Sequence, residues 1–179
     1  MIDTREFVLA RVEEVLQLIA PGVVFPLPGP PHREIMTDLH GRVFNRPRPD
    51  SKLDSSETPF VECITSSKRA DTIEVCDDTF YTVTTPMEVW GYIKADDTGQ
   101  EFNSPTRTAL NALRADLIVA MESVPYWIGA APNIVPSARQ RAGLAVVLTG
   151  QETQLFVGSK TAWVVLDYDL RYRFNTHNP

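Results

Sequence analysis

The chain has 179 residues, of which 43% are hydrophobic and 22% charged, a composition typical of one globular domain over residues 1–179. Its formal net charge of −6 argues against a protein that grips a nucleic-acid backbone. Because no run of about 18 apolar residues is present, we expect a soluble, intracellular protein without a membrane partner.

The first predicted element is an amphipathic helix over residues 4–19. Asp3 or Thr4 can supply the N-cap oxygen, and the Pro-Gly pair at 21–22 ends the helix. The apolar run 23–25 then predicts a short strand. The helix is predicted from the three- and four-residue spacing of Val8, Val12, Val15, Leu16 and Ile19.

Residues 26–54 carry six prolines and little periodicity, which predicts a long proline-rich loop with one short strand at 42–45. Loops longer than about 15 residues in a compact domain are often functional. This loop is therefore a candidate binding surface. Its arginines Arg33, Arg42 and Arg46 are candidate interface residues.

Strands are predicted over residues 59–66, 72–76 and 80–95. The last run alternates with period two, which is typical of a sheet packed on one face. Pro86 inside it predicts a bulge or an edge position, since proline cannot donate to a ladder. The apolar parity contains Tyr81, Val83, Met87, Val89 and Ile93.

The two cysteines would face each other if the flanking strands paired as a hairpin centred near Arg69 and Ala70. Cys63 and Cys76 lack metal-type spacing and are too few for a disulfide framework. We therefore interpret both as small core residues without a redox role.

A second helix is predicted from the N-cap Ser104 and the first helical residue Pro105 to a stop before Pro125. A loop is expected over 126–141. The helix carries an apolar stripe of Leu110, Leu113, Leu117 and Met121.

The chain closes with a strand at 144–148, a turn region at 149–160, a regular strand at 161–174 and a flexible tail at 175–179. The even positions of the last strand are all apolar, so a one-residue slip would bury charges and the register is fixed. This order predicts an α+β fold in a single domain, with two helices packed on one face of a mainly antiparallel sheet.

Candidate catalytic or metal-ligating residues are few. His32, Glu34, Asp38 and His40 form one cluster, but their spacing matches no zinc or deaminase pattern. The standard phosphate, hydride and hydrolase motifs are absent, so we expect no catalytic residues and no cofactor. Two carboxylate pairs that could bind a cation are interpreted as turn residues, namely Asp77 with Asp78 and Asp96 with Asp97.

Aromatic residues on the less apolar parity are candidate interface anchors, since tryptophan and tyrosine are favoured in protein interfaces. They are Phe80, Trp90 and Tyr92 on one strand and Trp163 on the last. A sheet covered on both faces would account for them equally well.

The last strand also carries acids followed by bases on its less apolar parity. These residues form either a solvated face or a subunit contact of complementary charge. They are Asp167, Asp169, Arg171 and Arg173.

Over residues 4–174 the chain resembles the tail-terminator (tail-completion, minor tail) proteins of long-tailed bacteriophages. The resemblance lies in the order of the elements and in their local sequence. It is carried by I-A-P-G-V-V at 19–24, R-V-F-N-R-P at 42–47, P-F-V-E-C at 59–63, V-W-G-Y-I-K-A-D at 89–96, the helix over 105–121 and D-Y-D-L-R-Y-R-F at 167–174.

The resemblance implies a structural virion protein without catalytic residues. Such proteins form a hexameric ring on the head-proximal end of the tail tube, stop its polymerisation and present a surface to head-completion or neck proteins. The implied partners are therefore other copies of the chain, the tail tube protein and a neck protein, with assembly in the host cytoplasm. DNA would pass through the lumen without specific binding, which suits an acidic protein.

Two alternatives stay open. A neck or head-tail joining protein, or another tail assembly factor, shares this size and fold class. From a different class, a metal-dependent hydrolase would use His32, Asp38 and His40.

Overall fold

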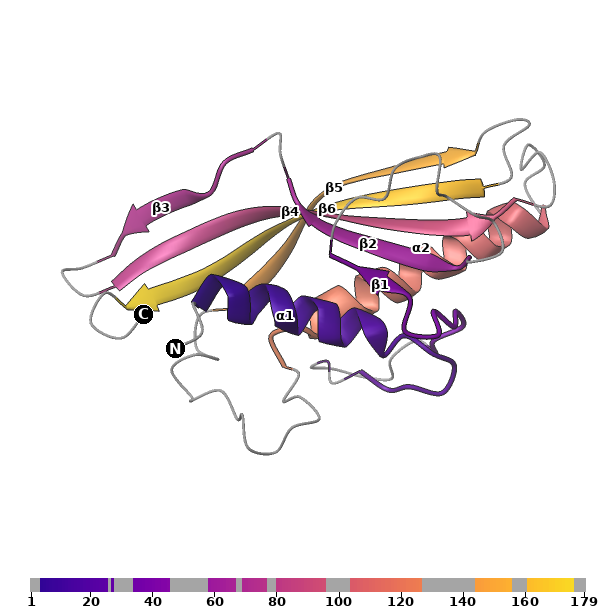
Figure 1. Ribbon diagram of the computed structural model, residues 1–179, viewed down its shortest axis with the longest axis horizontal. Helices are drawn as coiled ribbons and strands as arrows, with labels where there is room; N and C mark the ends of the chain where they lie inside the picture. Colours follow the sequence, from indigo (N-terminus) through magenta and orange to yellow (C-terminus); the bar gives the residue numbers. More distant parts are fainter. Residues whose placement is uncertain are drawn as a thin grey trace.

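In the part of the chain that the structure describes, a six-stranded sheet and two helices make up the fold (Figure 1). The computed structural model describes residues 4–25, 27, 34–45, 58–66, 69–76, 80–95, 104–126, 144–155 and 161–175. The elements are α1 (Thr4–Gln17), β1 (Val43–Phe44), β2 (Phe60–Thr65), β3 (Thr72–Val75), β4 (Phe80–Lys94), α2 (Pro105–Ser123), β5 (Ala145–Leu155) and β6 (Thr161–Asn175). The predicted α+β fold is confirmed.

The strands follow the order β1-β2-β4-β6-β5, and β3 also pairs with β4. β1 and β2 are parallel, while the other pairs are antiparallel. The central pair β4–β6 is in register over the full length of both strands, from Phe80 opposite Asn175 to Lys94 opposite Thr161. The predicted apolar face of the last strand is buried from Ala162 to Tyr172.

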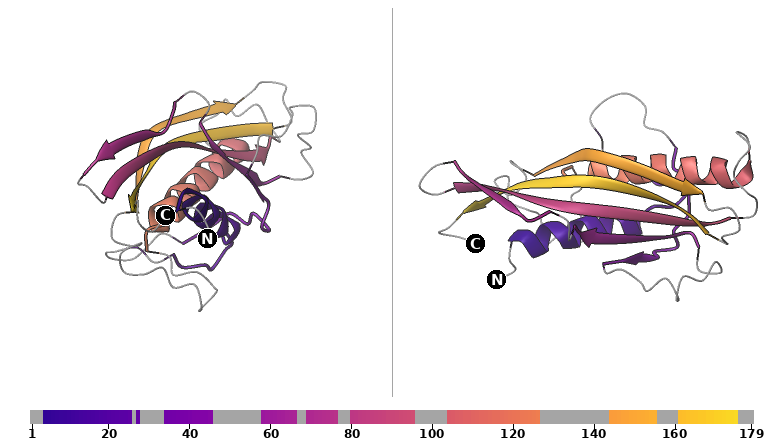
Figure 2. Two further views of the ribbon diagram at one scale, coloured as in Figure 1. Left: turned by 60° about the vertical axis from the view of Figure 1, so that its left-hand side comes forward. Right: turned by 90° about the horizontal axis from the view of Figure 1, so that it is seen from above.

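Both helices lie under one face of the curved sheet (Figure 1; Figure 2, left). α2 begins as predicted, because the Ser104 hydroxyl accepts a hydrogen bond from the Arg107 amide at 3.2 Å and Pro105 occupies the first turn. It ends at Ser123, before Pro125. The predicted stripe of Leu110, Leu113, Leu117 and Met121 is fully buried.

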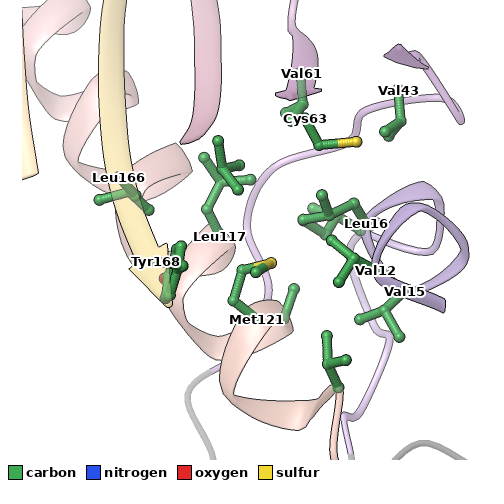
Figure 3. Close-up of a cluster of buried hydrophobic side chains, with 14 of the residues drawn as sticks. Val12, Val15, Leu16, Val43, Val61, Cys63, Leu117, Met121, Leu166 and Tyr168 are labelled. Carbon is green, nitrogen blue, oxygen red and sulfur yellow. The ribbon is translucent and has the colours of Figure 1, made fainter. Parts of the chain in front are cut away.

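The core fills the space between the helices and the sheet. Figure 3 shows Leu16 of α1, Met121 of α2 and Cys63 of β2 among its side chains. The buried Arg11 joins the two helices, since its Nε donates to the Val124 carbonyl at the end of α2 over 3.0 Å. This buried hydrogen bond holds α1 against the end of α2.

Part of the segment predicted as a loop is packed. Ile35, Leu39 and Val43 are buried in the core, and the Leu39 amide donates to the Ile19 carbonyl at 3.1 Å. The predicted strand at 42–45 is present as β1. Residues 34–42 contain no helix or strand, as the loop prediction requires, but they pack into the core, because apolar side chains recur every fourth residue from Ile35 to Val43. The interpretation without packed segments is wrong in this respect, while most of the rest of 26–54 lies outside the described residues.

Two other boundaries differ from the prediction. Residues 23–25 are not a strand, although Phe25 is buried. The strand predicted over 144–148 continues as β5 to Leu155, so the turn prediction is wrong for 149–155. A register shift between Leu148 and Gly150 leaves Thr149 as an extra residue, and this bulge broke the expected alternation.

β2 and β3 do not pair with each other. Both pair antiparallel with β4, one beside its second half and the other beside its first. The hairpin of β2 and β3 that would have placed the two cysteines opposite each other is therefore absent, and the cysteines do not face each other. Cys63 is buried as predicted, whereas Cys76 is exposed, so its assignment to the core is wrong.

Pro86 occupies the junction between β2 and β3 and is neither bulged nor in an edge strand. The Pro86 carbonyl accepts a hydrogen bond from the Ser66 amide at 2.9 Å, so the backbone polar groups of Pro86 point toward this junction and not toward β6. β2 ends opposite Met87 and β3 begins opposite Thr84, so no ladder donor is needed at this position. Proline is tolerated inside this central strand for that reason.

One end of the sheet extends beyond both helices (Figures 1 and 2). A 15-residue strand spans about 50 Å, whereas a 19-residue helix spans about 28 Å. β3, the start of β4 and the end of β6 form this overhanging end. Ile73 and Val75 of β3 are consequently 66% and 72% exposed.

We expect the substitution Gly91→Val to destabilise the protein. A Cβ atom at Gly91 would lie 2.9 Å from side-chain carbons of both Leu113 and Leu117 of α2. Overpacking of this kind costs about 1–3 kcal/mol. Urea unfolding followed by tryptophan fluorescence measures the loss, with Ala145→Val at an exposed position of β5 as the control. An unchanged midpoint would contradict this close packing of α2 on β4.

Candidate assembly interface

The charged residues of β6 lie on the face of the sheet opposite the helices. Asp169 forms an ion pair with Arg69 over 3.0 Å, although the two residues are 100 positions apart. Asp167 is half-buried beside Gly150, where a Cβ atom would lie 2.7 Å from its carboxylate. Arg171 and Arg173 are exposed. Their predicted orientation away from the apolar face is correct.

The aromatic candidates occupy the other half of the same face. Trp90 and Trp163 are half-buried and contact each other, with ring centroids 4.9 Å apart. Tyr92 is buried and stacks on Phe60 at 4.5 Å. The expectation of exposed aromatics is therefore wrong for Tyr92, because neighbouring rings pack on one another across the strands; the side chain of Phe80 lies outside the described residues.

Two buried carboxylates accompany these rings. Glu88 accepts hydrogen bonds from the Trp90 indole at 3.0 Å and the Ser66 hydroxyl at 2.8 Å. Glu62 accepts from the Tyr92 hydroxyl at 3.3 Å. These bonds offset the cost of burying the acids and fix the ring positions. The buried acids in the half of the face with the aromatic side chains thus have hydrogen-bond donors within the subunit. The half with Arg171 and Arg173 is the exposed part of the face.

The arginines of the 26–54 segment do not join this face. Arg42 is half-buried and donates to the Thr58 carbonyl at 3.4 Å, at the β1 side of the sheet. Arg33 and Arg46 lie outside the described residues. The structure therefore brings together the candidates on β4 and β6 but separates Arg42 from them.

The predicted ligand cluster has local turn geometry. Asp38 accepts from the His40 amide at 2.8 Å, and His40 has a φ of 49°, as in an aspartate-stabilised turn. Glu34 is exposed, while His32 and the carboxylate pairs at 77–78 and 96–97 lie outside the described residues. Within the described ranges, no three histidine, cysteine or acidic side chains gather as a metal site.

Cys63 is chemically inert in the fold. It is 4% exposed, and burial raises the pKa of its thiol to about 12. A thiol with so high a pKa carries almost no thiolate at neutral pH, and thiolate is the reactive form. Cys63 therefore belongs to the packing between β2 and α1.

An open groove of about 1080 Å³ lies where α2 begins, and its walls include Met36, His40, Pro59, Lys94, Pro105 and Ala109. The loop on one side of it is held by Asp116, whose Oδ2 accepts from the Met36 and Thr37 amides at 3.1 and 2.8 Å. Asp116 is fully buried. It is therefore the residue that positions this loop on α2.

Sequence reasoning missed Asp116, Arg69 and the buried acids. An acid between Leu113 and Leu117 on an apolar helix stripe was a usable signal, because a buried carboxylate must find donors. The sequence carries no signal for the Arg69–Asp169 ion pair, because this contact depends on which strands are neighbours.

Neither a protein-family model nor a curated protein matches this chain. Among the described residues, no helix is long and apolar enough to cross a membrane. The functional proposal therefore depends on the surfaces of the molecule and on the resemblance in element order.

We expect Asp116→Ala to release the 34–40 loop from α2. Loss of the two hydrogen bonds that the Asp116 side chain accepts costs about 1–3 kcal/mol, with faster hydrogen exchange at the Met36 and Thr37 amides. Asp116→Asn is the matched control, because its amide oxygen still accepts. Equal exchange rates in the wild type and Asp116→Ala would show that the loop is held by other contacts.

Proposed function

We propose that this protein is a structural virion component that forms a hexameric ring on the head-proximal end of a phage tail tube. The ring ends tube polymerisation and provides the attachment surface for the head or neck. In this role the protein has no catalytic residues and needs no cofactor. The resemblance over residues 4–174 supports this role, and of the elements that carry it the two helices and the strands β1, β2, β4 and β6 are present, whereas the strand at 23–25 is not.

The observation that carries the proposal is the presence of two different exposed surfaces on opposite sides of one sheet. β3 is exposed at one side, and β5 is exposed over 147–149 and 151–153 at the other. A closed ring uses head-to-tail contacts, in which each subunit offers two unlike surfaces. An open sheet of this kind supplies both surfaces on each subunit.

The charge balance agrees with a channel for DNA. At a formal net charge of −6, the protein repels a phosphate backbone more than it binds it. A lumen that DNA must slide through needs weak rather than tight contacts. DNA is therefore proposed as a passing occupant and not as a ligand.

We expect rings that cap one end of tail tubes from the phage that encodes the chain, and capped tubes that no longer elongate. Negative-stain imaging with light scattering, on the protein alone and mixed with tubes, tests this. A free monomer that forms rings only on tubes agrees with the proposal. Binding to the neck or portal side without tube capping would instead identify a head-tail joining protein.

The double variant Arg171→Glu with Arg173→Glu is expected to weaken ring assembly and leave the fold intact. Both side chains are exposed on the face away from the helices, so reversal of their charge removes no core contact. Light scattering and urea unfolding measure the two effects. Loss of cooperative unfolding would show that this face is needed for folding, and unchanged assembly would exclude it from the ring contact.

A further inference from the structure

β3 is an unprotected sheet edge. All four of its residues are exposed, and its two apolar side chains lie on the helix side of the sheet, opposite Tyr81 and Val83 of β4. Exposed apolar edges of this kind readily accept another strand, and proteins usually cover or charge them. Glu74 is the single charged residue of β3.

The first segment of β5, Ala145 to Leu148, is the matching edge on the other side of the sheet. It contains four residues before the bulge at Thr149, the same length as β3. Val147 and Leu148 are 37% and 39% exposed. Its helix-side residues, Val146 and Leu148, are apolar like those of β3.

Strand direction makes the two edges compatible. β3, β4, β6 and β5 are related by three antiparallel pairings, so β5 runs opposite to β3 within one subunit. When a second copy is placed beside the first by a head-to-tail rotation, its β3 runs antiparallel to the first copy's β5. The helices of both copies then lie on the same side of one continuous sheet.

The backbone groups also match. The Pro86 carbonyl points toward the β2 and β3 side, and backbone groups alternate between sides along an antiparallel strand. By this alternation, Ile73 and Val75 direct their N–H and C=O groups to the open edge of β3. Val146 and Leu148 do so at the open edge of β5. Each edge therefore presents its apolar residues at its hydrogen-bonding positions.

Charge selects one register between the two edges. Glu74 and Arg171 are both exposed on the face away from the helices, and neither has an ion-pair partner in the part of the chain described. With Glu74 opposite Ala145, Arg171 lies one strand further along the same row. Two strand spacings are about 10 Å, which the two long side chains can bridge over the small Ala145.

A shift of two residues is less favourable, because it sets Glu74 beside Val147, whose partner on β6 is Asp169. We infer that a second copy of this chain docks its β3 edge on the β5 edge, with Glu74 opposite Ala145 and facing Arg171. This contact rests on the proposed ring and specifies how neighbouring subunits join.

Cysteine cross-linking tests the contact. In the inferred register Thr72 lies opposite Val147 in a pair without mutual hydrogen bonds, where the Cα atoms are about 4.5 Å apart and a disulfide fits. In a Cys76→Ser background, oxidation of a mixture of Thr72→Cys and Val147→Cys proteins should give a covalent dimer. Neither variant alone should do so, because head-to-tail contacts join unlike edges. Thr72→Cys mixed with Glu152→Cys is the control.

The same samples are imaged with tail tubes, which separates failure of this contact from failure of the ring. Rings on tubes without the mixed cross-link would overturn the β3–β5 contact and leave the proposed function standing. A mixed cross-link without tube capping would support the contact and contradict the function. Absence of any self-association, with or without tubes, would overturn both.

Charge reversal gives a second readout. Glu74→Arg and Arg171→Glu should each weaken self-association about fivefold, and the double variant should restore it, since an exposed ion pair contributes up to about that factor. Glu152→Arg, an acid reversal beyond the bulge, is the matched control and should have no effect. Equal weakening by the double variant and the singles would overturn the inferred pairing of Glu74 with Arg171.

Discussion

The structure depends on the ladder between β4 and β6, which are paired along their full length. Every other strand except β1 pairs with one of these two, and α2 packs on both. The alternation of apolar residues on β6 fixes the register, since a slip by one residue would exchange Leu166 and Tyr168 for charged Asp167 and Asp169 in the core. Once the ladder is set, the buried face and both free edges of the sheet are determined.

The length of that ladder also explains where the molecule is exposed. Two helices cannot cover strands of about 50 Å, so the end that carries β3 extends beyond the core. At the covered end, buried acids such as Glu88 and Asp116 find donors and hold neighbouring segments in place. The same sheet is therefore packed against the helices at one end and has exposed edge residues at the other.

The elements whose signal is local could be predicted from sequence. The Ser104-Pro105 helix start and the two-residue period of β6 each depend on neighbours within a few positions. The failures involve pairing between distant segments. β3 continues beside β4 instead of folding back on β2, and nothing in the short segment between them encodes that choice. The core role of Ile35 was obscured by the surrounding prolines.

The charged row of β6 indicates what kind of surface would meet it. Asp169 is neutralised within the subunit by Arg69, whereas Arg171 has no ion-pair partner within the described ranges. The sequence predicted the row but not this asymmetry, because Arg69 reaches it only through the strand order. With the acid paired internally, the exposed end of the row is basic in a protein whose formal net charge is −6. A basic patch on an acidic molecule is electrostatically complementary to other copies of the same molecule, which is the property that the proposed contact between Arg171 and Glu74 of a second copy would use.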